Sequence, residues 1–298
     1  MSIILTTSAL SKSYGAIKAV QNLDLEISSG QVYGILGPNG SGKTTTLGMI
    51  LGIINPSSGK FKWFNNTLLK DSLYKIGSII ELPTFYPYLS AVQNLKIVTR
   101  IKGKGNDSID STLEKVGLSE RKNSSFKTYS LGMKQRLALG AALVAEPEVL
   151  VLDEPTNGMD PQGIADIRNL ILEVASGGTT IFLASHLLDE VQKICSHVAV
   201  LEKGKKIFDG PVDQILEGEE QIEIWAEDSE LLQQLLSEFK GIEDLTKMRD
   251  KFIIKLLPGP TKKDLHKYLI EKGVYPTHFM SRAGTLESKF LELLNHGK

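Results

Sequence analysis

Apolar residues form short runs at the start of the chain and longer blocks further on. Between residues 3 and 27 the runs are separated by turn signals such as "SYG", which predicts antiparallel strands. "VYGIL" (32–36) is continuously apolar, which is typical of a buried strand. A glycine-rich stretch follows, and "KTTTLGMILGII" (43–54) is expected to be a helix.

Strands and helices are then expected to alternate up to about residue 204. "NPSSGKFKWF" predicts a turn and a strand, and residues 84–145 are mostly helical in pattern. Further strands are expected at 75–80, 148–155, 179–185 and 197–204, and helices at 162–176 and 187–195. This alternation favours an α/β fold with a parallel sheet covered on both faces, an antiparallel β region at the front and a helical insertion.

The end of the chain shows a second pattern after an apparent linker, "LEGEE" (216–220). The expected order is strand, helix, strand, strand, helix, strand, helix, at 221–226, 229–240, 244–249, 252–257, 261–272, 274–281 and 285–295. The first six elements match a ferredoxin-like α+β unit. We therefore expect one domain at 1–217, with its helical part near 84–145, and a C-terminal accessory domain at 218–298.

Composition narrows the class of protein. The 298 residues are 41% hydrophobic and 23% charged, with 34 basic against 35 acidic side chains, so nucleic-acid binding is not expected. Cys195 is the only cysteine, which excludes internal disulfides and multi-cysteine zinc sites and agrees with a reducing cytoplasm. Neither a signal peptide nor a membrane span is expected from the apolar runs.

"GPNGSGKT" (37–44) follows a strand and opens a helix, which is the context of a phosphate-binding loop. The glycines let backbone N–H groups surround phosphates, Lys43 adds charge at the β- and γ-phosphates, and the Thr44 hydroxyl can ligate Mg²⁺. A plain glycine-rich turn is the alternative. The predicted nucleotide-binding residues here are Gly37, Pro38, Asn39, Gly40, Ser41, Gly42, Lys43, Thr44 and Thr45.

"VLVLDE" (149–154) supplies the acidic strand end that such a site needs. Asp153 is expected to hold Mg²⁺, and Glu154 faces the place of the γ-phosphate and of the attacking water, from which a carboxylate can accept a proton. Two solvated loop acids are the alternative. A site of this kind remains generic, since it suits a kinase, a GTPase or a motor.

"YSLGMKQR" (129–136) narrows the choice, although alone it is more often an ordinary N-capped helix. The order of phosphate loop, polar helix cap, "LVLDEPTNGMDP" and "ASH" (184–186) resembles the ATP-binding-cassette ATPases over residues 3 to about 217. The resemblance implies a homodimer or paired cassette, joined head to tail around two ATP molecules. Ser130 and the amides of Gly132 and Met133 would cap the γ-phosphate on the partner.

The same resemblance assigns several single residues. Tyr14 would stack on adenine and Val20 would line that face, although packing is the alternative for Tyr14. Asp160, in "NGMDP", would lie in the loop that crosses the dimer interface. His186 would be the switch histidine that contacts the γ-phosphate and orients water, so the expected catalytic group is Glu154, His186 and Lys43.

Two positions depart from the family pattern. Leu131 stands where the signature usually has glycine, so its backbone must accept a side chain. Glu81 stands where glutamine is usual, yet a carboxylate can still ligate Mg²⁺ together with Thr44 and Asp153. An acidic residue here is similar to the drug and antibiotic exporter subgroup, which includes bacitracin- and lantibiotic-type systems.

The expected function is that of a cytoplasmic ATPase subunit, peripheral on the inner face of the cell membrane, that powers export of a drug, peptide or lipid-like compound through separate polytopic permease subunits. Phe85, Tyr86 and Tyr88 follow Glu81 and could form the docking surface for these subunits; packing within the helical part is the alternative. A soluble ATPase of the same family, acting on a non-membrane partner, is the rival interpretation.

Overall fold

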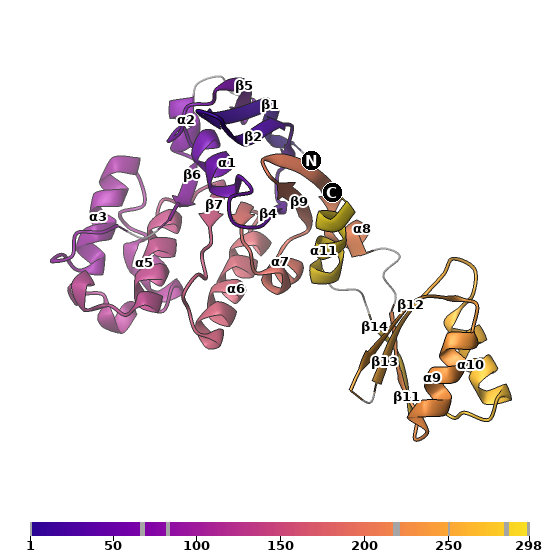
Figure 1. Ribbon diagram of the computed structural model, residues 1–298. Coiled ribbons are helices and arrows are strands. Elements are labelled where there is room, and N and C mark those ends of the chain that lie inside the picture. Colours follow the sequence, from indigo (N-terminus) through magenta and orange to yellow (C-terminus); the bar gives the residue numbers. More distant parts are fainter. Residues whose placement is uncertain are drawn as a thin grey trace. The chain divides into compact units, whose positions relative to one another are not determined.

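The computed structural model describes residues 2–65, 69–81, 84–216, 221–249, 251–282 and 286–296 (Figure 1). Its contacts divide the chain into two compact units, residues 1–212 and 213–296. The predicted linker lies outside the described residues from position 217 onward. That the second unit is an accessory domain stays a prediction.

An antiparallel sheet opens the first unit, as its run-and-turn pattern predicts. It contains β1 (Ile3–Tyr14), β2 (Ile17–Leu23), β3 (Glu26–Ser28) and β5 (Ser58–Trp63). β1 pairs with β3 and β5 along its first part and with β2 along its last part. Register shifts interrupt these pairings, and such irregularities bend a strand.

A six-stranded sheet forms the centre of the first unit. Its order is β10-β9-β4-β8-β7-β6, with β4 (Val32–Leu36), β6 (Ile76–Ile79), β7 (Val149–Asp153), β8 (Thr180–Ala184), β9 (His197–Glu202) and β10 (Lys205–Pro211). Five strands are parallel, and β10 alone runs antiparallel, against β9. Every residue of β4, β7 and β8 is buried, as continuous apolar runs require.

The helices of the first unit fall into two groups. α1 (Lys43–Ile50), α2 (Leu69–Leu73), α6 (Pro161–Ser176) and α7 (Leu188–Ile194) connect strands. α3 (Ala91–Lys102), α4 (Ile109–Lys115) and α5 (Leu131–Leu143) form the helical part, together with short turns at Ser119–Arg121 and Phe126–Thr128. α8 (Val212–Leu216) lies at the division between the units.

Most predicted elements are present, with four differences. The helix expected at 43–54 ends at Ile50, because Gly52 adopts a left-handed backbone (φ 72°) and the amides of Ile53 and Ile54 both bond to Gly48. α2, α8 and β10 were not predicted. α2 has only five residues, and half-exposed β10 lacks the apolar run of the central strands.

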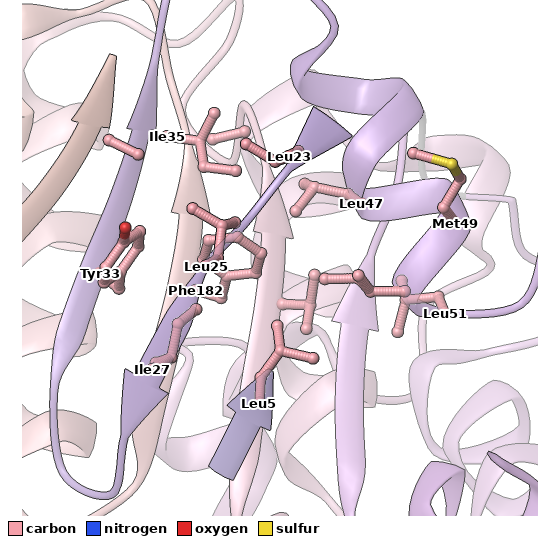
Figure 2. Close-up of a cluster of buried hydrophobic side chains, with 14 of the residues drawn as sticks. Leu5, Leu23, Leu25, Ile27, Tyr33, Ile35, Leu47, Met49, Leu51 and Phe182 are labelled. Carbon is pink, nitrogen blue, oxygen red and sulfur yellow. The ribbon is translucent and has the colours of Figure 1, made fainter. Parts of the chain in front are cut away.

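The core lies between one face of the central sheet and a second layer made by the antiparallel strands and α1 (Figure 2). Its buried side chains include Leu5, Leu23, Ile27, Tyr33, Ile35, Leu47 and Phe182. Each is expected to contribute about 1.5–3 kcal/mol through burial. The opposite face of the sheet meets α7, whose Val191 would lie 3.1 Å from a Cβ placed on Gly34.

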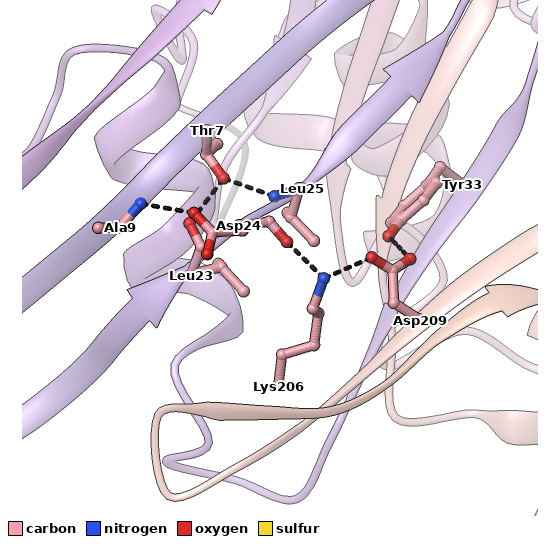
Figure 3. Close-up of polar contacts among 8 residues, drawn as sticks. All are labelled: Thr7, Ala9, Leu23, Asp24, Leu25, Tyr33, Lys206 and Asp209. Atoms are coloured by element: carbon pink, nitrogen blue, oxygen red, sulfur yellow. Dashed lines mark hydrogen bonds and ion pairs between the residues drawn. The ribbon is translucent and has the colours of Figure 1, made fainter.

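A polar network joins the antiparallel strands to the edge of the central sheet (Figure 3). Lys206 donates to the Asp24 carbonyl and to the Asp209 carboxylate, which also accepts from the Tyr33 hydroxyl. Burial and the neighbouring Asp209 carboxylate raise the pKa of Tyr33. β10 is thereby fastened to the turn between β2 and β3.

The second unit has a four-stranded antiparallel sheet in the order β12-β13-β11-β14. Its elements are β11 (Gln221–Trp225), α9 (Ser229–Glu238), β12 (Ile242–Met248), β13 (Lys251–Leu256), α10 (Lys262–Glu271), β14 (His278–Arg282) and α11 (Leu286–His296). With the strands taken in chain order, the arrangement is second-third-first-fourth, which is the ferredoxin-like topology that the sequence predicts. Its own core includes Ile224, Leu232, Phe252 and Leu265.

Candidate nucleotide site

The predicted site residues meet because their strands are parallel neighbours. β8 lies between β4 and β7, with Ala184 paired to Ile35 on one side and to Asp153 on the other. β6 lies beyond β7, with Ile79 opposite Leu152. The residues that follow these strands therefore share one edge of the sheet, the carboxyl edge at which open α/β sheets bind ligands.

The phosphate loop joins β4 to α1 and depends on glycine at defined positions. Gly42 has φ 107°, and a Cβ there would lie 2.4 Å from the Ala19 carbonyl oxygen. A Cβ on Gly37 would lie 2.4 Å from the Leu201 carbonyl oxygen. Only glycine allows such close backbone approach, and the amides at the start of α1 are thereby available to an anion. Pro38, Asn39, Gly40 and Ser41 lie in this loop, and Thr44 and Thr45 in the first turn of α1.

Lys43 folds back onto its own loop. Its ammonium donates to the Gly37 carbonyl at 2.8 Å and to the Pro38 carbonyl at 3.4 Å, and the residue is 6% exposed. Burial lowers the pKa of Lys43, while the Glu154 and Asp153 carboxylates act to raise it. Because desolvation disfavours the charged form of Lys43, a nearby negative group such as a phosphate would stabilise its ammonium.

Asp153 ends β7 in a buried position. The residue is 5% exposed, and its Oδ1 is a buried oxygen without a hydrogen-bond partner. Desolvation raises the pKa of Asp153; hydrogen bonding by the Thr44 side chain lowers it, and the Glu154 and Glu81 charges raise it. Glu81 is exposed and has a left-handed backbone (φ 57°).

This set of oxygen atoms suits Mg²⁺. Mg²⁺ is bound through one or two carboxylates and completed by phosphate oxygens and water, and Asp153 presents an unpartnered oxygen beside the Thr44 hydroxyl. Within the described ranges no group of three or more His, Cys, Asp or Glu side chains could hold a metal alone. The residues therefore fit an ion shared with a nucleotide better than a closed metal centre.

Glu154 and His186 come together from adjacent strand ends. His186 Nδ1 lies 2.7 Å from Glu154 Oε2, and the His186 amide donates to the same oxygen at 3.3 Å. Glu154 holds φ 48°, and its backbone amide donates a hydrogen bond to the Ala184 carbonyl at 2.9 Å. A non-glycine residue in this conformation is strained, and such strain persists where surrounding contacts over-determine the geometry.

The signature segment is a regular, exposed helix start. Ser130 caps α5, its hydroxyl accepting from the Met133 amide at 3.3 Å. Ser130 and Leu131 are exposed, and Gly132 and Met133 are half-buried. Leu131 is the first residue of the helix and is not among the residues with positive φ, so the departure from glycine carries no backbone strain.

Three further predicted residues lie in distinct surroundings. Tyr14 is 48% exposed, with the Lys12 ammonium 5.0 Å from its ring centroid. Val20 is 1% exposed and packs beneath Gly42, and its role at the face that Tyr14 offers to adenine stays a prediction. Asp160 caps α6 by accepting from the Gly163 amide at 2.8 Å.

The aromatic residues after Glu81 divide between the two alternatives. Phe85 packs edge-on against buried Phe126, with ring centroids 5.2 Å apart. Tyr86 and Tyr88 are 51% and 70% exposed. The packing alternative is therefore supported for half-buried Phe85, and docking stays a prediction for all three residues.

Sequence reasoning missed Gln135, which lies on α5 after the signature. It is 4% exposed, and its Oε1 has no hydrogen-bond partner. A polar residue inside a helix is a weak signal, because most such side chains point to solvent. In the described part of the chain, no helix combines the length and the apolar character needed to cross a bilayer.

Comparison with known proteins identifies similar chains. A family model described as ABC transporter matches residues 20–157. The bacitracin transport ATP-binding protein BcrA of Bacillus licheniformis is 37% identical, covering 100% of this chain and 99% of the relative. The lantibiotic transport ATP-binding protein SrtF of Streptococcus pyogenes is 40% identical over 68% of this chain and 89% of its own length. The structure of cbiO1 from Clostridium perfringens, part of the ABC transporter complex cbiONQ, aligns with a TM-score of 0.66 at 28% identity, over 80% of this chain and 96% of that one.

Proposed function

The chain belongs to the ABC transporter family as one of its ATP-binding proteins, and on this premise we propose that it pairs head to tail with another cassette around two ATP molecules and powers export through separate membrane subunits. Its enzymatic activity is ATP hydrolysis. The observation that carries the proposal is the contact of Glu154 with His186 at the sheet edge shared with the phosphate loop.

ATP is the substrate and is held by the loop and α1. The N-terminal amides of α1 bind its phosphates, and Lys43 leaves the Gly37 carbonyl to pair with them. Tyr14, with an exposed ring, stacks on the adenine. When bound, Mg²⁺ would be held by Thr44, Asp153 and Glu81 and would neutralise charge on the phosphates.

Hydrolysis requires a base for water. The oxygen of a water molecule attacks the γ-phosphorus while Glu154 accepts a proton from that water. The bond between the γ-phosphorus and the bridging oxygen of the β-phosphate breaks, which releases ADP and phosphate. His186 holds the Glu154 carboxylate through Nδ1 and turns its other nitrogen toward the γ-phosphate. Lys43 stabilises the charge that develops on the transferring group.

The signature segment completes the site of the other cassette. Its support is that Ser130 is exposed at a helix start, where the Gly132 amide has no earlier helical partner and the Met133 amide donates only to the Ser130 hydroxyl. An anion on the partner subunit would accept from the Gly132 amide and the Ser130 hydroxyl and would compete for the Met133 amide. Asp160, which caps α6, lies in the proposed interface. Either a homodimer or a pair of related cassettes would form such an interface.

A membrane partner receives the motion. The exposed rings of Tyr86 and Tyr88 follow the Glu81 segment and offer a docking surface for a permease at the inner face of the membrane. The relatives are named for the transport of bacitracin and lantibiotics. The proposed substrate class is therefore a peptide-like antibiotic, and the proposed direction is export. A non-membrane partner is the rival outcome.

The test of the proposed catalysis is Glu154→Gln. The amide keeps the shape of the side chain but cannot accept a proton, so ATP turnover should fall by about 100-fold or more while ATP binding persists. The variant should also accumulate as an ATP-dependent dimer in size exclusion. Turnover like that of the unmodified protein would remove Glu154 from its role.

The test of the partner surface is Tyr86→Ser with Tyr88→Ser. The double variant should lose co-purification with a polytopic membrane protein from detergent extracts, while the isolated cassette keeps its ATPase activity. Phe85→Ser is the matched comparison, since loss of its contact with Phe126 should lower thermal stability instead. Enrichment of ribosomes or nucleic acid in place of a membrane protein would favour the rival.

A further inference from the structure

His186 lies in a short connection between β8 and α7, and hydrogen bonds hold this connection on both sides of His186. On the β8 side, the Ser185 amide donates to the Ile35 carbonyl at 3.3 Å. On the α7 side, the Leu187 amide donates to the Ser185 hydroxyl at 3.0 Å, and α7 begins at Leu188. The orientation of α7 therefore affects where His186 can reach.

α7 has little to hold it in place by itself. It has seven residues, and its N-cap, Leu187, makes no side-chain capping bond. Helices this short are marginal without tertiary support. Apolar contact comes from buried Val191 and Ile194, which allow α7 to slide or tilt because apolar packing is not directional.

An ion pair supplies the directional contact. Arg168 of α6 places its Nη1 2.9 Å and 3.0 Å from the two carboxylate oxygens of Glu190, in the first turn of α7. The side chains are 23% and 14% exposed. Charge-assisted bonds are the stronger class, and a partly buried pair that loses one member leaves the other charge without compensation. Lys193 also approaches Glu190, at 3.4 Å, but is 50% exposed.

We propose that the Arg168–Glu190 ion pair is a positioning device that holds α7 so that His186 stays against Glu154. Glu190 is the third residue of α7 and lies four positions after His186. Neither Arg168 nor Glu190 touches nucleotide; they act on hydrolysis through His186. The inference rests on the proposed catalytic role of Glu154 and His186.

The experiment measures ATP turnover and nucleotide affinity in Arg168→Met and Glu190→Gln. A displaced His186 should lower kcat roughly ten- to hundredfold. The affinity for a fluorescent ATP analogue should stay within about twofold, because uniform binding does not involve this pair. The charge-swapped double variant, Arg168→Glu with Glu190→Arg, restores the attraction and should recover most of the lost turnover.

The control is Lys193→Met, which removes the other cation near Glu190 from an exposed position. It should change kcat by less than about twofold. Unchanged kcat in both single variants overturns the proposal, and so does equal loss of kcat and nucleotide affinity without recovery in the double variant, since that pattern marks general damage to the fold. If a single variant does not fold, the double variant and Arg168→Lys, which keeps the charge, still decide the question.

Glu154→Gln is assayed in parallel. If it hydrolyses ATP normally, the proposed catalytic role fails whatever the ion pair does. If it is inactive while Glu190→Gln and Arg168→Met are normal, only the positioning role of the ion pair fails. The two failures are therefore distinguishable.

Discussion

The phosphate loop and the signature segment both present the start of a helix, yet their surroundings differ. Around the loop, Gly42 holds a left-handed backbone, Lys43 is 6% exposed, and Ser41 Oγ and Asp153 Oδ1 are buried without partners. In the signature segment Ser130 is exposed and makes an ordinary capping bond, and Leu131 needs no unusual backbone.

The difference shows that one helix start is lined by unsatisfied buried groups and the other is not, which agrees with the proposal that the second serves as half of a site. Unsatisfied buried groups cost stability unless a ligand completes them, so their concentration at the loop marks a place shaped for phosphate and a cation. A satisfied, exposed cap costs nothing, and it becomes a site only when another molecule brings an anion to it.

The largest effect is expected from a pair of matched glycine substitutions. Gly42→Ala places a Cβ 2.4 Å from the Ala19 carbonyl oxygen at φ 107°, so it should cost about 1–3 kcal/mol of stability and abolish nucleotide binding. Gly132→Ala meets only Met159 Cε, at 3.5 Å, and should leave folding and monomer binding intact. Melting curves and titration with a fluorescent nucleotide compare the two, and normal binding by Gly42→Ala would contradict the distinction.

The second prediction concerns Asp153→Asn, which should abolish Mg²⁺-dependent ATPase activity but stabilise the nucleotide-free protein. Burial raises the pKa of Asp153, so the ionised carboxyl costs stability above its unfolded pKa, and this cost disappears as the pH falls below that value. Near pH 7 the melting temperature of the nucleotide-free variant should therefore rise.

The control for this prediction is the pH dependence itself. The increase in melting temperature caused by Asp153→Asn should shrink as the pH is lowered, because the Asp153 carboxyl then becomes protonated and is neutral like the amide of the variant. A lower melting temperature of the variant at pH 7 would show that the Asp153 carboxylate stabilises the folded protein. The unpartnered oxygen of Asp153 would then not be a cost to stability.

A third, intermediate effect is expected when Ser130→Arg and Lys43→Ala chains are mixed. If the signature acts across the interface, one composite site of the heterodimer loses both groups and the other keeps both. ATP-dependent dimerisation or partial hydrolysis should therefore survive in a tag-verified heterodimer. Loss of both activities would place Ser130 and Lys43 in the same site of one chain, or would mean that the two sites fire together.

The smallest effect is expected from Leu131→Gly, which restores the usual glycine of the family signature. Because Leu131 begins a regular helix, the change should cost about 0.5–1 kcal/mol and alter ATPase activity by less than about threefold. Denaturant unfolding and steady-state kinetics measure the two quantities. A tenfold gain in activity would mean instead that Leu131 obstructs the partner's nucleotide.

The sequence predicts the elements well where a local pattern is strong. The apolar runs of β4, β7 and β8 form the expected buried strands, which bring the residues after them to one edge of the sheet; that a nucleotide binds there stays a prediction. β10 was missed because its half-exposed residues alternate poorly and an antiparallel edge strand needs no buried run. The short helix α2 has too few residues for periodicity to register.

Contacts between distant residues could not be predicted. The approach of His186 to Glu154, 32 positions apart, depends on the neighbouring positions of β7 and β8. The burial of Val20 beneath Gly42 and the ring contact of Phe85 with Phe126 likewise depend on tertiary packing. An aromatic or aliphatic side chain has the same local signature whether it faces a ligand, a partner or the core.

β10 has one further consequence, for association between copies. An open sheet edge offers unpaired backbone groups to any other strand, which leads to aggregation. Here one edge is β10, which carries Lys205 and Lys206 and ends in Pro211, and the other is β6, with only four residues. Lysine, proline and short length all discourage strand addition. A protein proposed to work by repeated, reversible pairing through its nucleotide face is thus protected against irreversible pairing through its sheet.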